Sequence, residues 1–369
     1  MSLEAFKPKP QGSRRRQITD AVREMIHFGE LAAGSRLPAT QALAAQWDAT
    51  VPTVHDALTA LVKEGLLERT PRVGTFVRQP EEGLKVIAVY DNGEAWRQPQ
   101  QAFSRAICQE LHVLCSDRGT VDQAWVDPRP AAEQGEPWEA LTKAASERRI
   151  QAVIVPAIDS AHMTWLKKLP VPLAVFSSGY WPNRVYLNVQ NLVREAMELL
   201  AAQGCRKVGV ISVARRPGGA KGRPSNTMDA FWPAVDKTAA RLGLECRPDW
   251  QISPPGDTLD SSRFEQFGYQ SFPALYHMDD RPDGVFVWTD YVARGVIIAA
   301  AAEQVRIPGE MQLVLARNAE VGLFCPFPAG YVDVHAREVA AELLDLATAI
   351  YNGREPAPRA IPIHPTPNT

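Results

Sequence analysis

The sequence lacks the features of a membrane-spanning, exported or disulfide-stapled protein. No apolar run is long enough to span a bilayer, and no charged-then-apolar signal segment opens the chain. The five cysteines are an odd number and include no C-x-x-C pair, which argues against a zinc ribbon or a disulfide framework. These absences fit a reducing cytosol, and we therefore expect a cytoplasmic protein.

Motifs for catalysis and cofactor binding are missing as well. The chain has no G-x-G-x-x-G after a predicted strand, no Walker A sequence, no H-E-x-x-H and no G-x-S-x-G. The segment "RRPGGAKGRPSN" has glycines and cations but lacks the G-K-[ST] ending, so we expect a surface loop there. Since the seven histidines also lack metal-ligand spacing, the sequence predicts no enzyme, no cofactor and no metal site.

Charge is unevenly distributed along a chain whose net charge is only −2. Residues 1–79 hold eleven Lys or Arg and eight Asp or Glu, so they carry 11 − 8 = +3 and the remainder carries −2 − 3 = −5. This basic segment opens with Lys7, Lys9 and the run Arg14-Arg15-Arg16. A basic N-terminal arm of this kind suggests contacts with phosphates, although a solvated tail is the alternative.

Residues 17–79 carry the pattern of three short helices followed by a β-hairpin. Apolar residues recur at helical spacing around Ile18, Leu43 and Val54. Thr50 stands where an N-cap is expected, and Gly65 where the third helix ends. "LLERTPRVGTFV" then predicts two strands around a turn. Helices this short must share one core, so the sequence predicts a winged helix-turn-helix whose third helix presents its N-terminal end to the major groove.

These residues resemble the DNA-binding domain of the GntR family. The resemblance rests on "I-x-x-x-V-x-x-M-I-x-x-G-x-L-x-x-G-x-R-L-P", "TVHDALTALVKEGLL" and "GTFV", in this order. The chain departs from the family at Val51 and His55, where Arg is frequent, and at Ala39-Thr40-Gln41, where Ser-Glu-Arg is frequent. The resemblance and the basic arm imply double-stranded DNA as a partner, with the following contact residues, each of which could instead be ordinary polar surface: Arg14, Arg15, Arg16, Arg36, Thr40, Gln41, Thr50, Thr53, His55, Arg72 and Gly74.

A polar linker at residues 80–84 separates this domain (residues 1–79) from a second one at residues 85–364. In the second domain, buried strands such as "KVIAVY", "QAVIVPA" and "RKVGVIS" alternate with segments of helical periodicity. Strands that alternate with helices in this way predict doubly wound, parallel α/β sheets. Open sheets of this class bind ligands beyond the carboxyl ends of their strands.

The second domain resembles the ligand-binding domain of the LacI family, which is itself similar to periplasmic sugar-binding proteins. The resemblance rests on "LLAAQGCRKVGVIS", "PDGVFVWTDYVARGVIIAAAAEQVRIPGEMQLV" and "VDVHAREVAAELLDLATAIYNGREP". It implies two lobes, at about 84–186 with a return segment and at about 188–316, joined by three chain crossings around a ligand cleft. Asp290 matches a ligand-binding Asp of the family, whereas Asn188, Thr227 and Ser178 replace its usual Asp and Arg residues.

The predicted effector site combines these positions with polar and aromatic residues of the first-strand loop. The candidates are Asp91, Asn92, Trp96, Phe103, Ser178, Asn188, Arg223, Thr227, Trp288 and Asp290. Core packing is the alternative for each tryptophan, and solvation for the loop arginine. Tyr180 and Trp181 are further candidates for stacking on a sugar ring.

The sequence as a whole predicts a cytoplasmic, ligand-responsive DNA-binding regulator. We expect a homodimeric repressor with a sugar or sugar-like effector. Two alternatives remain open: a constitutive DNA-binding regulator whose α/β domain only dimerises, and an enzyme or transport-type binding protein with an accessory helix-turn-helix.

Overall fold

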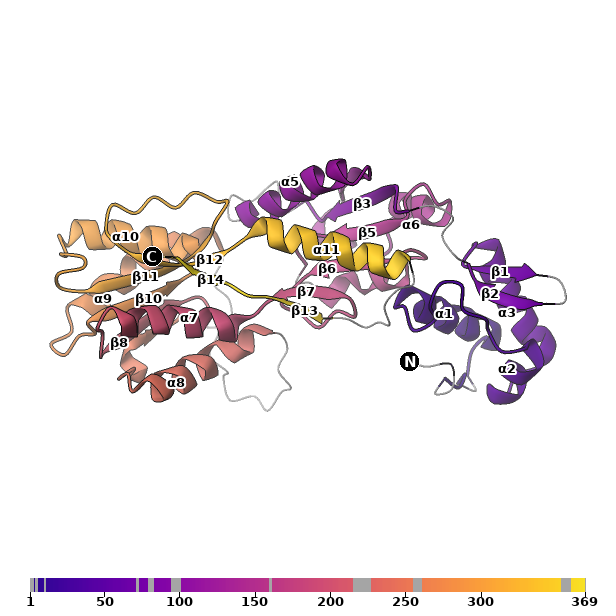
Figure 1. Ribbon diagram of the computed structural model, residues 1–369, viewed down its shortest axis with the longest axis horizontal. Coiled ribbons are helices and arrows are strands. Elements are labelled where there is room, and N and C mark those ends of the chain that lie inside the picture. The colour runs from indigo at the N-terminus through magenta and orange to yellow at the C-terminus, as the bar shows by residue number, and fades with distance from the viewer. Residues whose placement is uncertain are drawn as a thin grey trace.

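The computed structural model is an elongated molecule in which a small N-terminal domain and two α/β lobes follow one another along the long axis (Figure 1). The structure describes residues 3, 6–9, 11–70, 73–78, 83–93, 101–158, 161–214, 227–254, 261–352 and 360–368. Three of the predicted site residues, Arg72, Trp96 and Arg223, lie outside the described residues. No helix of the described segments is long and apolar enough to cross a membrane.

The N-terminal domain is a winged helix-turn-helix, as predicted. Its elements are α1 (Arg14–His27), α2 (Thr40–Gln46), α3 (Val51–Lys63), β1 (Leu67–Thr70) and β2 (Gly74–Val77). Fully buried side chains from all three helices and the hairpin form one core, which includes Ile18, Leu43, Trp47, Leu58 and Leu67. None of these helices could bury its apolar stripe alone, so the shared core is what makes the domain stable.

The basic run at residues 14–16 differs from the predicted arm because it forms the first turn of α1. Ser13 is the N-cap, and its side chain accepts a hydrogen bond from the Arg16 amide. A capped helix start fixes the three arginines on the body of the domain, whereas an arm would have left them on a flexible tail.

The first lobe is a parallel six-stranded sheet in the order β13-β7-β6-β5-β3-β4. Its strands are β3 (Val86–Asp91), β4 (Val121–Val126), β5 (Ala152–Val155), β6 (Leu173–Phe176), β7 (Arg184–Leu187) and β13 (Ala360–Ile363). Alternate residues of β3 point to opposite faces: Ile87 packs with α5 (Ala102–Asp117) and α11 (Ala336–Tyr351), and Ala88 with α6 (Glu139–Ser146) and the short helix η3 (Ala161–Lys168). The lobe is therefore doubly wound.

The second lobe repeats this design with one exception. Its sheet runs in the order β14-β12-β11-β10-β8-β9, and all neighbours are parallel except β12 and β14. The strands are β8 (Val208–Ser212), β9 (Gln251–Ile252), β10 (Gly284–Trp288), β11 (Gln312–Asn318), β12 (Gly330–Val334) and β14 (Thr366–Asn368). One face carries α7 (Val189–Ala202) and α8 (Phe231–Leu242), and the other α9 (Phe264–Tyr276) and α10 (Asp290–Ala302).

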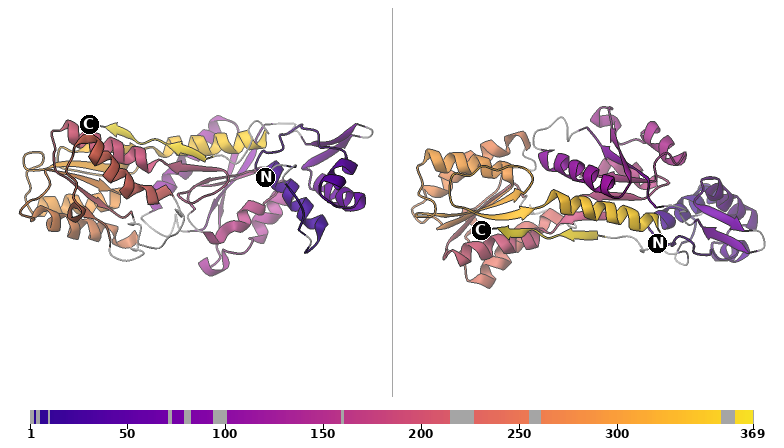
Figure 2. Two further views of the ribbon diagram at one scale, coloured as in Figure 1. Left: turned by 90° about the horizontal axis from the view of Figure 1, so that it is seen from below. Right: turned by 45° about the horizontal axis from the view of Figure 1, so that its top comes forward.

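The chain passes between the lobes at three places, as the LacI resemblance implied. It leaves the first lobe after β7, returns through α11, and passes again between β13 and β14 (Figure 2). Two details differ from the expectation. The second lobe extends past residue 316 to include β12, and β14 lies beyond the predicted domain end at residue 364.

Candidate DNA-binding surface and effector cleft

Helix α3 is held at its N-terminus by a threonine cap. Thr50 Oγ1 accepts a hydrogen bond from the Thr53 amide at 3.3 Å and lies 2.7 Å from Thr53 Oγ1. Pro52 occupies the first turn, where an N–H group would have no intrahelical acceptor, so the N–H that proline lacks costs no hydrogen bond. The side chains of Thr50 and His55 are exposed and that of Thr53 is half-buried. The capped end of α3 therefore offers hydroxyl and imidazole groups to a ligand outside the domain.

An arginine on β1, which sequence reasoning missed, adjoins this helix. Arg69 Nη2 donates to the His55 carbonyl at 3.3 Å, and its Nη1 lies 3.4 Å from His55 Nε2. The signal was present, because alternate residues of a predicted strand beside a helix must face that helix. Arg69 adds a positive charge next to the position where this chain has His55.

The wing is a hairpin with a third segment along its edge. β1 and β2 pair antiparallel from Leu67 with Val77 to Thr70 with Gly74, and Arg36 forms a bridge with Phe76. Gly74 has φ +153°, and a Cβ there would come within 2.8 Å of Arg36 Nε. A glycine is thus required where the arginine crosses the hairpin. The exposed guanidinium of Arg36 lies beside Gly74, at the turn end of the wing.

The three arginines of the first turn of α1 have different partners. Arg14 binds the Asp48 carbonyl and lies 3.7 Å from the Asp48 carboxylate. Arg16 lies 3.8 Å from Asp20. Arg15 is exposed, and no acceptor among the described residues pairs with it. On α2, Thr40 is half-buried and Gln41 exposed. Arg15 is therefore the cation of this turn that is most accessible to a phosphate.

The second candidate site is a cavity of about 250 Å³ between the two lobes. It lies at the carboxyl ends of strands from both sheets, where parallel sheets present their ligand sites. The lining includes the following residues with polar, charged or aromatic side chains: Gln101, Phe103, Ser104, Phe176, Ser177, Ser178, Trp288, Thr289, Asp290, Tyr291, Arg317 and Asn318. Four of the predicted effector residues, Phe103, Ser178, Trp288 and Asp290, thus come together in this cleft.

Asp290 supplies a buried carboxylate at the first turn of α10. Its side chain is almost fully enclosed, and Asn318 Nδ2 donates to its Oδ2 at 3.1 Å. Burial raises the pKa of this carboxyl above its usual range, while the Asn318 hydrogen bond opposes the shift. Beside it, the buried Thr289 Oγ1 has no hydrogen-bond partner among the described residues. The unpaired Thr289 hydroxyl, next to the buried Asp290 carboxylate, suits a hydroxylated ligand.

Aromatic rings form one wall of the cleft. Trp288 stacks on Phe231 with ring centroids 4.9 Å apart and an interplanar angle of 17°. Phe103 meets Phe176 edge to face at 6.0 Å. Trp288 therefore packs in the core, which was the alternative considered for it. The same residue also lines the cavity. Trp181, by contrast, is buried in the core of the first lobe, and Lys167 lies over its ring.

The remaining described candidates lie outside the residues that line this cavity. Asp91 is buried and accepts a hydrogen bond from the Gly93 amide, and the Asn92 carbonyl accepts one from Gln134. Asn188 stands at the first chain crossing, but its side chain is the N-cap of α7 and accepts from the Asn191 amide at 3.1 Å. Thr227 opens the short helix η4 (Thr227–Ala230), and its neighbour Met228 lines the cavity.

Arg317 is the cleft cation that sequence reasoning missed. Its Nε donates to Asp333 Oδ1 at 2.7 Å, and its guanidinium lies 3.8 Å from the centroid of the Tyr331 ring. Burial opposes ionisation of Asp333, yet the hydrogen bonds from Arg317 and Asn368 hold the pKa of that carboxyl below its usual range. Because Arg317 and Asn318 end the strand "QLVLARN", the same end-of-strand rule that selected Asp290 applies to them.

Comparison with known families matches a part of each domain. Residues 14–77 match the bacterial regulatory proteins of the gntR family, and residues 197–368 match the periplasmic binding protein-like domain. The GntR resemblance is thus confirmed for the N-terminal domain, and the resemblance to periplasmic binding proteins for residues 197–368.

Two relatives are similar in the N-terminal domain. The mannosyl-D-glycerate transport/metabolism system repressor MngR of Escherichia coli (strain K12) is 41% identical over 64 residues, which are 17% of this chain and 27% of the relative. The histidine utilization repressor of Klebsiella aerogenes is 38% identical over 65 residues, 18% of this chain and 27% of the relative. The chain thus spans about a quarter of the length of these relatives.

Solved structures resemble the two-lobed domain. A LacI family transcription regulator from Clostridium acetobutylicum superposes with a TM-score of 0.58 at 17% identity, covering 77% of this chain and 99% of that one. The trehalose repressor from Escherichia coli gives a TM-score of 0.57 at 15% identity, with coverage of 77% and 99%. At these identities the likeness establishes the fold of the α/β domain.

Proposed function

We propose that this chain, which joins a GntR-type winged helix-turn-helix domain to a periplasmic-binding-protein-like domain, is a ligand-responsive transcription regulator. It binds double-stranded operator DNA as a repressor and takes a sugar or sugar-like effector. The observation that carries the proposal is the presence in one chain of a capped, exposed α3 and a cleft with a buried, hydrogen-bonded carboxylate. Three of the four similar proteins named above are called repressors, which supports the same function.

In the proposed DNA complex, the arginines of the N-terminal domain contact phosphates and the N-terminal end of α3 contacts bases. Arg15 at the start of α1 and Arg36 beside the wing contact phosphates, with Arg72 predicted to do the same at the wing tip. Thr53 and His55 reach base edges, because the N-terminal part of a recognition helix is what enters the major groove. Phosphate contacts supply affinity and base contacts supply specificity.

The proposed effector is a polyol, a sugar or a sugar acid. The Asp290 carboxylate can accept hydrogen bonds from ligand hydroxyls, and the rings of Trp288 and Phe103 offer apolar faces to the carbon skeleton. Arg317 lines the same cavity, but its guanidinium is already paired with the Asp333 carboxylate, so the hydroxyl-binding groups carry the proposal. We propose no enzymatic activity for this site.

We propose that the regulator is a homodimer that works in the cytoplasm, where its DNA is. Exposed valines on α5 and on the edge strand β4 of the first lobe support a self-association face: Val113, Val121 and Val126 are 43%, 56% and 41% exposed. Two-fold symmetry would place two recognition helices on successive major-groove faces. Effector binding then changes DNA affinity if it favours one lobe angle over another.

Two alternatives are separated from this proposal by one experiment. The full-length protein is used to select bound sequences from random duplex DNA, and a thermal-shift screen then tests sugars, sugar acids and polyols. Anisotropy of the selected duplex is measured with and without each ligand that stabilises the protein. We expect a ligand that changes DNA affinity. Stable DNA binding that no ligand changes would favour the constitutive regulator, and failure to select any duplex would leave the enzyme alternative.

A further inference from the structure

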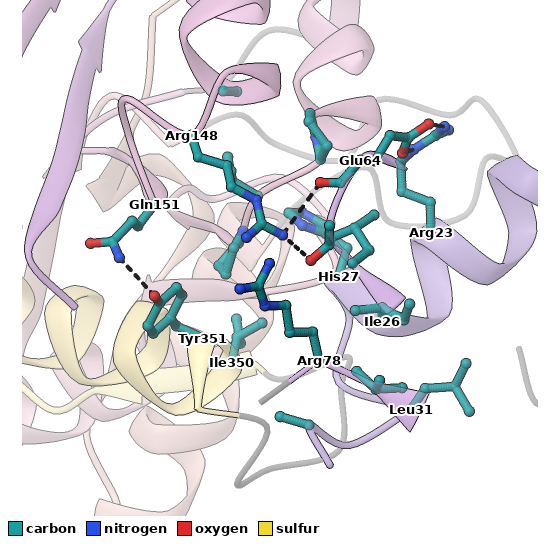
Figure 3. Close-up of a pocket in the computed structure, with 18 of the residues that line it drawn as sticks. Arg23, Ile26, His27, Leu31, Glu64, Arg78, Arg148, Gln151, Ile350 and Tyr351 are labelled. Carbon is teal, nitrogen blue, oxygen red and sulfur yellow. Dashed lines mark hydrogen bonds and ion pairs between the residues drawn. The ribbon is translucent and has the colours of Figure 1, made fainter. Parts of the chain in front are cut away.

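A second cavity lies where the N-terminal domain meets the first lobe, far from the effector cleft. Its volume is about 350 Å³, within the range of small-molecule sites. Its walls come from the ends of α1 and α3, from β2, and across the domain boundary from residues 145–151, 170–172 and the end of α11 (Figure 3). The proposed function assigns no role to it.

Positive charge dominates the lining. Arg23 is neutralised by Glu64, to which its Nε and Nη2 donate at 3.0 and 2.8 Å. Among the described residues, the lining contains two more arginines, Arg78 and Arg148, and no further carboxylate, so the described lining side chains together carry 3 − 1 = +2. Figure 3 shows the guanidinium groups of Arg78 and Arg148 approaching each other from opposite walls.

Arg148 uses only one of its guanidinium nitrogens. Nη2 donates to the carbonyls of Glu64, at 3.4 Å, and Gly65, which follow the last turn of α3. Nε and Nη1 have no acceptor among the described residues. Burial, together with the nearby charge of Arg78, lowers the pKa of Arg148. A guanidinium with two unused donors at a cavity wall favours an anion beside it.

A buried histidine adds a second, independent observation. His27 lines the cavity and is only 4% exposed, yet neither ring nitrogen has a hydrogen-bond partner among the described residues. Burial lowers the pKa of this imidazole to about 3, so at neutral pH it carries one N–H donor and one acceptor. Since buried polar groups are nearly always paired, an unpaired imidazole in a cavity wall indicates a missing partner.

Apart from Gln151 and Tyr351, whose side chains hydrogen-bond to each other over 2.7 Å, the rest of the lining is mainly apolar and limits what the anion can be. It consists mainly of Ile26, Leu31, Leu66, Val77, Pro170, Val171, Pro172 and Ile350. A sugar phosphate would leave its hydroxyls against these side chains without partners. We propose that this cavity is a second ligand site, and that it binds a monocarboxylate with an apolar body, such as a medium-chain fatty acid. The carboxylate lies between Arg78 and Arg148, within reach of His27.

Such a ligand would act on the recognition helix directly. Arg148 belongs to the first lobe, and the carbonyls that it contacts end α3. A carboxylate that engages the free side of this guanidinium therefore joins the lobe, the ligand and the C-terminal end of α3 in one contact network. The site would regulate the placement of the DNA-binding domain independently of the effector cleft.

Isothermal titration of the full-length protein with octanoate tests the proposal, with 1-octanol as the uncharged comparison. We expect octanoate to bind at least about tenfold more tightly than 1-octanol, because hydrogen bonds to charged groups are the stronger ones. Arg148→Gln should weaken octanoate binding by about tenfold or more. Arg149→Gln is the matched control, since this neighbour pairs with Glu147 and does not line the cavity.

Three results would overturn the proposal: no octanoate binding, equal binding of the two compounds, or equal losses in the Arg148 and Arg149 variants. Leu31→Trp provides a second test that retains both arginines. It fills the apolar wall and should block octanoate in a protein that still unfolds cooperatively. Asp290→Asn should leave octanoate binding unchanged, and a loss in that variant would place the compound in the effector cleft instead.

Discussion

Asn318 donates a hydrogen bond from Nδ2 to Oδ2 of Asp290 over 3.1 Å. Asn318 is the last residue of β11, and Asp290 is the first residue of α10, just beyond the end of the neighbouring parallel strand β10. The bond therefore joins the ends of two neighbouring strands at the cleft. It fixes one carboxylate oxygen and thereby orients the other. A ligand that enters the cleft meets an acceptor whose direction is already set.

Replacing Asp290 with Ala should cost about 1.5–3 kcal/mol of effector affinity, the range for a hydrogen bond to a charged group. Calorimetry with the sugar or sugar acid found by thermal shift measures this loss. Asp290→Asn keeps the shape and should retain part of the affinity. Wild-type affinity in a folded Asp290→Ala protein would place the effector elsewhere.

Replacing Arg15 with Gln should weaken DNA binding about equally for all sequences. Log affinity falls as log salt concentration rises, and each lost phosphate contact makes this fall shallower by about one unit of slope. Anisotropy titrations at several salt concentrations measure this slope. Arg241→Gln removes an exposed cation of the second lobe, paired with Glu198, and should change nothing. An unaltered slope in the Arg15 variant would remove this residue from the proposed interface.

Replacing Val121 with Lys should weaken the proposed dimer. An edge strand with an exposed valine is suited to pairing with a second copy, whereas a lysine there opposes it. Sedimentation of the full-length protein at micromolar concentration gives the distribution of monomer and dimer. Val73→Lys is the control, because Val73 in the wing is 49% exposed, similar to Val121, and lies in another domain. A wild-type monomer, or equal effects of both changes, would contradict the proposed face.

Replacing Thr50 with Ala should destabilise the N-terminal domain by about 1 kcal/mol, the usual cost of removing a threonine N-cap. The Thr53 amide would lose the acceptor that it now has at 3.3 Å. Thermal unfolding followed by circular dichroism measures the change. Thr50→Asn keeps a capping oxygen and should unfold close to the wild-type temperature, so equal losses in both variants would argue against capping as the cause.

The stability of the N-terminal domain should fall as the pH decreases from about 6.5 toward 3. Burial lowers the pKa of His27 from the ordinary histidine value of 6.5 to about 3, so the unfolded chain takes up this proton at a higher pH than the folded one. The stabilisation is therefore complete above pH 6.5 and is lost progressively below it. Denaturant unfolding at a series of pH values measures it. In His27→Phe the fall should be shallower, and identical slopes would contradict the assignment.

Local signals were enough to predict most of the fold. Helical spacing, the Thr50 cap and the glycine after α3 define the DNA-binding domain, and Gly65 does adopt a left-handed conformation with φ +70°. The alternation of buried strands and amphipathic helices likewise predicted doubly wound parallel sheet structure, and the LacI resemblance added its division into two lobes. Ser13 could also have been identified as an N-cap, but charge counting favoured an arm at residues 14–16, where the cap makes a helix.

The sites were less predictable, because a side chain's partner is not a local property. Asn188 at a strand-to-helix junction is equally suited to capping α7 and to binding a ligand, and only the structure shows the cap. Arg317 could have been found by applying the end-of-strand rule to every strand. The cavity at the domain boundary gives no sequence signal, since its walls come from segments as distant as His27, Arg148 and Tyr351.

The last described residues have a mechanical consequence. β13 belongs to the sheet of the first lobe and β14 to that of the second, with only His364 and Pro365 between them. The segment at residues 360–368 is therefore anchored in both lobes. Together with the crossings after β7 and before α11, it makes three chain connections between the lobes (Figure 1). We expect three such connections to let the lobes open and close about this region while limiting their relative twist.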